Sequence, residues 1–512
     1  MRSLLGKSLT ALAVCGTSLV ACAGLLDIPD RAVGDGGGGG DGSVSDAPAT
    51  VTDCKAGIEI RILVDATGAT KGVAVPYFFG ELDYFRELNK NGGIQGCPIN
   101  MQYQDYAYDP ATAQTIYDQW KGSPDWDKVA AVFGFGSGDT LQLAPHARED
   151  QKPLISASYF GGLAAPNPVA IDVNVPELDA TFVENSFPTH LTSDGFPYNF
   201  FTGTDYSTGI RIGMFHVKTQ GGKRVGFFHC SAAYCTGPIP AGRTYARAQG
   251  LNLGRDLTVE LTDDQTKYNQ QVHDYFKAEF DHSQTDGTYT PVDWVWMGNT
   301  TATTAYLVKA IANLSNTTIT GPGDSAAEKA YLTSASTSVQ VIVNNWGFDE
   351  TLSGLCGPAC NGRVHGIVPF TAYDDASRGS TEIKKVSALH DAWRAFDTSN
   401  PGSVRFGDGG APPSGPFKNV RYVQGYVSAY VFRIAIERVI AAGKPITGPN
   451  VKEALETFQQ VDTGGLCDKL SFGSGDHRPQ STETIYKFGS DGSLVAEPPS
   501  RTIALDSNWL GW

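Results

Sequence analysis

The segment Lys128–Thr140, KVAAVFGFGSGDT, holds the pattern that decides the fold class. Its apolar run from Val129 to Phe133 predicts a buried strand, and three glycines and a serine separate that strand from a stretch of helical character. A glycine-rich turn between a strand and a helix leaves the first N–H groups of the helix free to bind an anion. The segment therefore predicts one strand–helix unit of an α/β protein, with a candidate anion site in its turn.

The alternation of strand and helix continues on both sides of this unit. Three neighbouring strands are predicted from their β-branched and apolar residues, at 58–66, 98–107 and 152–158. Between them, 73–91 has the apolar spacing of a helix, and a second helix begins with Asp109 as N-cap and Pro110 at its first position. Strands and helices that alternate in this way form a parallel, doubly wound sheet.

The pattern starts again further along the chain and so predicts a second lobe. Strands are predicted there at 223–231, 256–264, 292–298 and 339–345, and a further apolar segment follows at 364–370. Helical stretches follow at 421–443 and 450–461, and 469–495 has the pattern of a short antiparallel finish. A chain of 512 residues is too long for one core, which agrees with two α/β lobes.

The N-terminus has the pattern of an export signal. Two basic residues precede an apolar stretch, 9–21, that is too short to span a bilayer. It ends in Leu19-Val20-Ala21-Cys22, which resembles the lipobox of bacterial lipoproteins. Residues 1–21 are therefore interpreted as a lipoprotein signal peptide and Cys22 as the lipidated residue. The alternative is an ordinary signal peptide with incidental cysteines.

The mature chain is predicted to be acidic and tethered to a membrane by lipid alone. Residues 22–53 comprise the lipidated cysteine and a Gly-, Ser- and Asp-rich flexible linker. Removal of 1–21 deletes two positive charges and moves the formal net charge from −15 to −17, which opposes nucleic-acid binding. No later stretch has the roughly 18 consecutive apolar residues of a membrane span.

Seven cysteines follow the lipidated one, and an exported protein can pair them. Two short spacings, and two cysteines placed just ahead of expected strands, favour the disulfides Cys54–Cys97, Cys230–Cys235 and Cys356–Cys360. Cys467 remains as the odd cysteine. The nine histidines form no spaced pair of the kind that binds zinc, so no metal and no cofactor are predicted.

Several ordered motifs together point to a family. They are ELNKNGGIQGCPI (87–99), DYAYDPATAQ (105–114), the Gly-Ser turn, KPLISAS (152–158), the helical run 422–458 and YKFGSDG (486–492). This set resembles the type I periplasmic solute-binding proteins, in particular the leucine/isoleucine/valine-binding branch that serves ABC transporters. The resemblance covers residues 58–495. It implies two lobes joined by three crossovers, with the ligand in the cleft between them.

The same resemblance implies where the lobes meet. It places the crossovers near Pro197–Phe201, Asn344–Trp346 and Thr463–Leu466. Lobe 1 then comprises 54–200 and 346–463, and lobe 2 comprises 201–345 and 464–512.

A ligand site follows from the resemblance as well. In the family, the Gly-Ser turn and the turn after the next strand hold the α-carboxylate of the ligand, at positions that fall on Ser137, Gly138, Ser158, Tyr159 and Phe160. Tyr234 matches a tyrosine that closes over the ligand, and Tyr206 follows the first crossover. The alternatives are that the glycines only let a helix pack closely on a strand, and that Tyr234 packs only within its own lobe.

Two other kinds of anion site agree less well with the turn. Gly134-x-Gly136-x-x is followed by Asp139, whose charge would oppose a dinucleotide pyrophosphate. Phe135 stands where a serine hydrolase has the first glycine of G-x-S-x-G, and no histidine is identifiable as a base. The chain is therefore predicted not to be an enzyme.

One position departs from the family. Amino-acid binders of this branch pair the ligand ammonium with an acidic residue at the position of Trp346, and here Asp349 and Glu350 follow only three and four residues later. A desolvated ammonium without a carboxylate is costly, whereas tryptophan offers apolar area. The departure favours an aromatic or aliphatic carboxylate or amide as the solute.

The predicted function is capture of a small amino-acid-like carboxylate or amide for an ABC permease, by a periplasmic, lipid-anchored protein that does not bind nucleic acid. The alternative is a lipoprotein that uses the same fold to sense a ligand or to scaffold, without transport. No signalling module is evident in the sequence, which favours transport.

Overall fold

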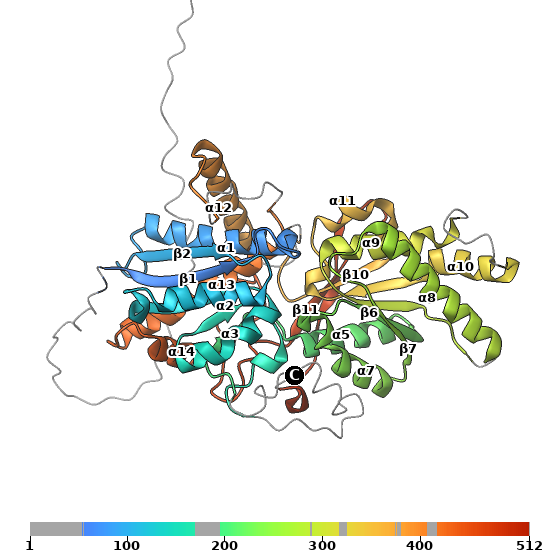
Figure 1. Ribbon diagram of the computed structural model, residues 1–512, viewed down its shortest axis with the longest axis horizontal. Helices are drawn as coiled ribbons and strands as arrows, with labels where there is room; N and C mark the ends of the chain where they lie inside the picture. The colour runs from blue at the N-terminus through green and yellow to red at the C-terminus, as the bar shows by residue number, and fades with distance from the viewer. Residues whose placement is uncertain are drawn as a thin grey trace, which may run out of the picture. The chain divides into compact units, whose positions relative to one another are not determined.

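The computed structural model describes Cys54 and residues 56–168, 195–286, 289–316, 325–373, 375, 380–406 and 417–510. The predicted signal peptide, Cys22 and the linker lie outside these residues. The described chain has an α/β fold with two mainly parallel sheets in two lobes, which confirms the predicted fold class (Figure 1). None of the helices in this part of the chain is long and apolar enough to cross a membrane.

The first lobe contains a parallel sheet of five strands in the described residues, in the order β2-β1-β3-β4-β5. The strands are β1 (Ile58–Val64), β2 (Ile99–Asp105), β3 (Val129–Gly134), β4 (Leu154–Ser156) and β5 (Asn199–Phe200). Every residue of β3 is buried, as its unbroken apolar sequence predicts for a central parallel strand.

The helices of this lobe are α1 (Lys71–Lys90), α2 (Pro110–Lys121), α3 (Ser137–Glu149), α12 (Ser380–Ser399), α13 (Val420–Ala441) and α14 (Gly448–Glu456). Asp109 caps α2 by accepting a hydrogen bond from the Ala111 N–H, which confirms the predicted helix start. Helix α13 packs closely on α1 because two glycines lie at the crossing. A Cβ atom on Gly80 would lie 2.1 Å from the carbonyl oxygen of Tyr422, and one on Gly425 would lie 1.9 Å from that of Tyr77.

The second lobe contains a sheet of seven strands in the described residues, in the order β12-β11-β10-β9-β8-β6-β7. Five strands are parallel: β6 (Arg224–His229), β7 (Asn252–Thr258), β8 (Trp294–Gly298), β9 (Gln340–Val343) and β10 (Val364–Val368). An antiparallel hairpin, β11 (Thr482–Phe488) and β12 (Leu494–Thr502), completes the sheet, which confirms the antiparallel finish.

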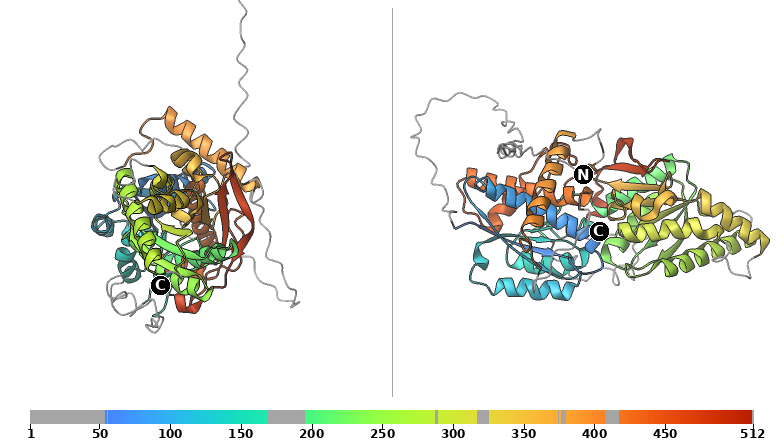
Figure 2. Two further views of the ribbon diagram at one scale, coloured as in Figure 1. Left: turned by 90° about the vertical axis from the view of Figure 1, so that its right-hand side faces the viewer. Right: turned by 90° about the horizontal axis from the view of Figure 1, so that it is seen from above.

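Helices surround this second sheet, and α8 and α10 lie side by side at its far end (Figures 1 and 2). Their bounds are α5 (Tyr206–Thr219), α6 (Ala233–Thr236), α7 (Ile239–Ala248), α8 (Gln265–Thr285), α9 (Thr301–Ala312), α10 (Ala326–Ser338) and α11 (Leu352–Cys356).

Two of the three crossovers lie later in the chain than the sequence boundaries place them. Strand β10 pairs with β9, so the chain leaves the second sheet after Val368 and not at Asn344–Trp346. The reason is that β10 is an apolar strand that either sheet could bury, and its pairing with β9 decides which sheet takes it.

The third crossing is also displaced. Beyond Thr463–Leu466 the chain still contacts the first lobe, because the His477 N–H donates to the Ala164 carbonyl and the His477 ring stacks on Phe200 at 4.1 Å between centroids. The crossing lies beside Gln480, whose amide donates to the Thr202 carbonyl of the first crossing at 2.8 Å. Segment 346–368 therefore belongs with the second lobe, and 464–478 with the first.

Candidate ligand-binding site

Residues of both lobes line a small cavity of about 20 Å³. The first lobe contributes Thr70, Val73, Tyr108, Phe135, Gly136 and Ser137, and the second contributes Tyr206, Tyr234, Thr300 and Trp346. A space of this size holds about one water molecule. The two walls are therefore closed upon each other, and a solute of amino-acid size enters only if they separate.

Sheet topology explains why these residues meet. In the first sheet the strand order reverses between β1 and β3, and Thr70 and Gly136 follow the carboxyl ends of those two strands. In the second sheet the order reverses between β6 and β8, and Tyr234 and Thr300 follow those strands. Because ligands of open α/β sheets bind at such reversal points, the cavity lies where both sheets favour a site.

Within the described chain, helices α1, α3 and α9 begin at N-cap residues that line the cavity. Thr70 is the N-cap of α1, Gly136 that of α3 and Thr300 that of α9, while Tyr206 is the first residue of α5. The partial positive charges of helix N-termini favour an anionic group. The cavity therefore suits a carboxylate or a comparable polar head.

Of the predicted carboxylate-binding residues, only Ser137 lines the cavity. Ser137 lines the cavity and accepts a hydrogen bond from the Ser158 hydroxyl at 2.7 Å, so Ser158 orients Ser137 from behind. Gly138 does not line the cavity, since a Cβ atom there would point at Pro110, 3.3 Å from its Cγ. Tyr159 and Phe160 are fully buried behind the wall and also do not line it.

Tyr108 lies in the cavity wall with a left-handed backbone, at φ 58°, and Ala107 before it has φ 52°. Non-glycine residues seldom adopt this region, and such strain clusters at functional sites. The Tyr108 ring lies against Gly136, where an added Cβ atom would be 2.5 Å from its Cε2. Gly136 therefore allows the Tyr108 ring to approach the turn closely, which agrees with the alternative that the glycines serve close packing. Gly136 also lines the cavity.

Asp139 lies directly beneath this wall. Its Oδ1 accepts a hydrogen bond from the Tyr106 hydroxyl at 2.9 Å. Burial raises the pKa of Asp139 to about 7. The carboxyl group is therefore partly protonated at neutral pH, which weakens its repulsion of an anion in the cavity.

Trp346 forms the opposite wall. Its Nε1 donates to the Tyr206 hydroxyl at 2.8 Å, and its ring lies 5.7 Å from that of Tyr159 and 5.4 Å from that of Phe135. The Arg421 guanidinium of α13 lies 5.0 Å from the centroid of the indole ring. The tryptophan is thus held by both lobes, and it offers the cavity an apolar face with its N–H already bonded.

Neither acidic residue after Trp346 lines the cavity. Asp349 accepts a hydrogen bond from the Thr301 hydroxyl at 2.7 Å and lies 3.7 Å from Arg421 Nε. Glu350 accepts from the backbone N–H groups of Tyr373 and Val420, and burial raises its pKa to about 7. The described lining residues include no carboxylate, so none of them could pair with a ligand ammonium.

Tyr234 is 4% exposed, and its hydroxyl donates to Asn299 Oδ1 at 3.4 Å. The structure joins Cys230 to Cys235 on either side of it, and also joins Cys54 to Cys97 and Cys356 to Cys360. These are the pairs that the sequence favours, and Cys467 is buried and belongs to none of them. The Cys230–Cys235 bond constrains the loop that presents Tyr234.

Tyr206 also separates the cavity from a second one of about 10 Å³ inside the second lobe. Glu483 and Asn344 line this second space, and Glu483 Oε2 and Asn344 Nδ2 have no hydrogen-bond partner in the described chain. Burial raises the pKa of the Glu483 carboxyl group well above its usual range.

The sequence prediction missed six wall residues: Thr70, Val73, Tyr108, Phe135, Gly136 and Thr300. Thr70 and Thr300 could have been found as N-caps that follow the strands at the two reversal points. Tyr108 stands inside the DYAYDPATAQ motif, and Phe135 inside the Gly-Ser turn.

A family model described as periplasmic binding protein matches residues 57–493, so the chain belongs to this family. A search of curated protein sequences found no match. Among solved structures, the chain is similar to an ABC transporter substrate-binding protein from Aeropyrum pernix, with 24% identity and a TM-score of 0.65 over 89% of this chain and 98% of that one.

Two further structures have the same fold. A branched-chain amino acid ABC transporter protein from Thermus thermophilus with bound valine has 17% identity and a TM-score of 0.64, over 88% of this chain and 97% of that one. A fatty acid ABC transporter substrate-binding protein from Thermomonospora curvata has 17% identity and a TM-score of 0.62, over 89% and 94%. At these identities the likeness establishes the fold.

Proposed function

We propose that this chain is a periplasmic, lipid-anchored solute-binding protein that captures a small carboxylate or amide between its lobes and delivers it to an ABC transporter. The observation that carries the proposal is the wall that includes three helix N-termini in the described chain and is lined by no carboxylate. Family membership and the ABC transporter proteins of the same fold support the transport role.

The preferred solute is an acid or amide without an amino group. Helix N-termini stabilise the anionic head, whereas an ammonium would be desolvated beside Trp346 without a partner. The similar structures named for valine and for a fatty acid share a carboxylate as ligand chemistry, and a fatty acid has no amine. The aromatic rings of Tyr206, Tyr234 and Trp346 supply the apolar area for the rest of the solute.

Matched pairs of ligands test this specificity. Leucine is compared with 4-methylpentanoate and phenylalanine with 3-phenylpropanoate by isothermal titration calorimetry, because each pair differs only in the amino group. We expect the acid without the amine to bind at least about tenfold more tightly, a difference of about 1.4 kcal/mol. Tighter binding of both amino acids would contradict the proposed specificity.

The lipid anchor is tested separately. The Cys22→Ala variant should accumulate as an unprocessed or mislocalised precursor that incorporates no labelled fatty acid. Cys15→Ala is the matched control, because Cys15 lies within the predicted signal and is removed with it. Equal labelling of the Cys22→Ala variant and the parent would contradict lipidation at Cys22.

A further inference from the structure

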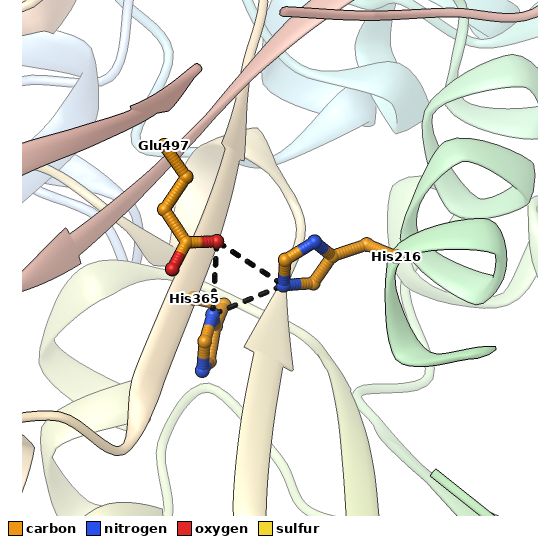
Figure 3. A group of neighbouring side chains, drawn as sticks. All are labelled: His216, His365 and Glu497. Carbon is orange, nitrogen blue, oxygen red and sulfur yellow. Dashed lines mark hydrogen bonds and ion pairs between the residues drawn. The ribbon is translucent and has the colours of Figure 1, made fainter. Parts of the chain in front are cut away.

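His216, His365 and Glu497 bring their side chains together in the second lobe, from three separate elements (Figure 3). His216 lies on α5, His365 on β10 and Glu497 on the edge strand β12. His216 is ten residues along α5 from Tyr206, which corresponds to about 15 Å of helix. The cluster is therefore distinct from the ligand cavity.

The three facing atoms have the spacing of a tetrahedral metal site. His216 Nε2 lies 3.1 Å from His365 Nδ1 and 3.5 Å from Glu497 Oε2, and His365 Nδ1 lies 3.8 Å from the same oxygen. Zn–N and Zn–O bonds of about 2.0–2.2 Å place the ligand atoms of a tetrahedral site roughly 3.3–3.5 Å apart. Zn²⁺ could therefore bind among these atoms with shifts of only a few tenths of an ångström.

Hydrogen bonding within the cluster is incomplete. The His216 side chain is 0% exposed and that of Glu497 is 14% exposed, and Glu497 Oε2 has no hydrogen-bond partner among the described residues. Buried polar atoms of this kind are costly unless something binds them. A proton on His216 Nδ1 would leave the Nε2 lone pair available to a metal.

The surroundings hold the ligands in place. The Trp294 ring lies 5.0 Å from the His365 ring and 6.0 Å from the His216 ring, so it forms an apolar wall beside both. Lys487 pairs with Glu497 through Oε1, which leaves Oε2 directed at the histidines.

We propose that His216 Nε2, His365 Nδ1 and Glu497 Oε2 form a Zn²⁺ site, with water as the fourth ligand. Two imidazoles and a carboxylate are a ligand set that zinc takes in proteins, whereas Mg²⁺ and Ca²⁺ prefer oxygen ligands alone. The metal would tie the edge strand β12 to β10 and α5 and so fasten the C-terminal hairpin to the second lobe. The site adds a structural role to the second lobe that does not depend on the solute.

Zinc binding can be measured directly on the tag-free, purified chain after treatment with EDTA. Titration with ZnCl₂ in a calorimeter should give one Zn²⁺ per chain, with elemental analysis confirming the ratio. The Glu497→Gln and His365→Gln variants should each bind at least tenfold more weakly. His390→Gln is the matched control, because His390 is also buried and its Nδ1 lies 2.9 Å from a carboxylate oxygen of Asp391.

Two further measurements keep the test decisive if a variant unfolds. Lys487→Met removes the cation that competes for Glu497 and should tighten Zn²⁺ binding, while Co²⁺ in the parent should show the strong visible absorption of a four-coordinate site. The proposal is overturned if the parent binds no Zn²⁺ at about 100 μM, or if Glu497→Gln and His365→Gln bind as tightly as His390→Gln. The weak absorption of six-coordinate Co²⁺ would overturn the tetrahedral arrangement.

Discussion

The two walls of the ligand cavity differ in chemistry. The wall of the first lobe includes two helix N-termini beside Val73 and Phe135, with Ser137 hydrogen-bonded to Ser158 and Gly136 packed against Tyr108. The wall of the second lobe is mainly aromatic, with Trp346 bonded to Tyr206 and Tyr234 fixed beside a disulfide. We infer from this difference that the first wall binds the polar head of the solute and that the second wall covers its apolar part.

The largest expected effect comes from placing a negative charge in the first wall. Ser137→Asp should weaken binding of an anionic solute at least about a hundredfold, because like charges a few ångströms apart repel by several kcal/mol in a partly desolvated site. Ser137→Asn is the control of equal size without the charge. Calorimetry with the best acid of the matched pairs provides the measurement.

Gly138→Asp sharpens the same experiment. Its side chain would point toward Pro110 and away from the cavity, so the loss of affinity should be much smaller than for Ser137→Asp. Equal losses for the two variants would mean that the head of the solute does not lie against Ser137.

Truncation in the second wall should have the next largest effect. Trp346→Ala removes ring area and the donor to Tyr206, and should weaken binding by about tenfold or more while leaving the preference for an anionic head unchanged. Trp346→Glu should shift the preference toward leucine over 4-methylpentanoate, because it supplies a carboxylate for the ammonium. If Trp346→Ala changed head-group preference as well, the two walls would not act separately.

A change of pH should alter the affinity less than the substitutions above, and it also tests the first wall. Asp139 has a pKa of about 7, so it is largely neutral at pH 6 and largely charged at pH 8. A carboxylic solute stays ionised throughout this range, so its affinity should fall several-fold as the pH rises from 6 to 8, through repulsion of about 1 kcal/mol.

Asp139→Asn should remove most of this slope. Burial raises the pKa values of the neighbouring Tyr106 and Tyr108, which keeps both neutral, and Asp65 is the other carboxyl group that acts on Asp139. A slope that persists in Asp139→Asn would assign the effect to a group other than Asp139.

The smallest expected effect concerns the disulfide beside Tyr234. The Cys230→Ser, Cys235→Ser double variant should weaken binding by roughly two- to threefold, since a short loop restricts the unfolded chain least and its loss only loosens the tyrosine. The Cys356→Ser, Cys360→Ser variant is the control, because that pair does not flank the cavity. Peptide mapping under non-reducing conditions should first recover all three pairs, and Cys467 joined to Cys356 or Cys360 would contradict them.

Local sequence pattern predicted most of the strands, the cap of α2 and the antiparallel finish, because these depend on residues close together in the chain. The strand predicted at 256–264 was misplaced, because β7 spans Asn252–Thr258. Ser137, Tyr206, Tyr234 and Trp346 were found by resemblance to family motifs and do line the cavity. The pattern could not separate Ser137 from Gly138, since which residue faces the cavity depends on how α3 packs against Pro110.

Hydrophobic period and turn chemistry are local properties, so the residues alone predict an α/β protein of two lobes with a Gly-Ser turn at the start of a helix. Three further features depend on packing between distant segments: β10 joins the second sheet, Asp349 binds Thr301 and Arg421, and His216, His365 and Glu497 meet. The two histidines are 149 residues apart, and they meet only because strands pair and helices pack. Their spacing along the chain therefore does not predict the contact.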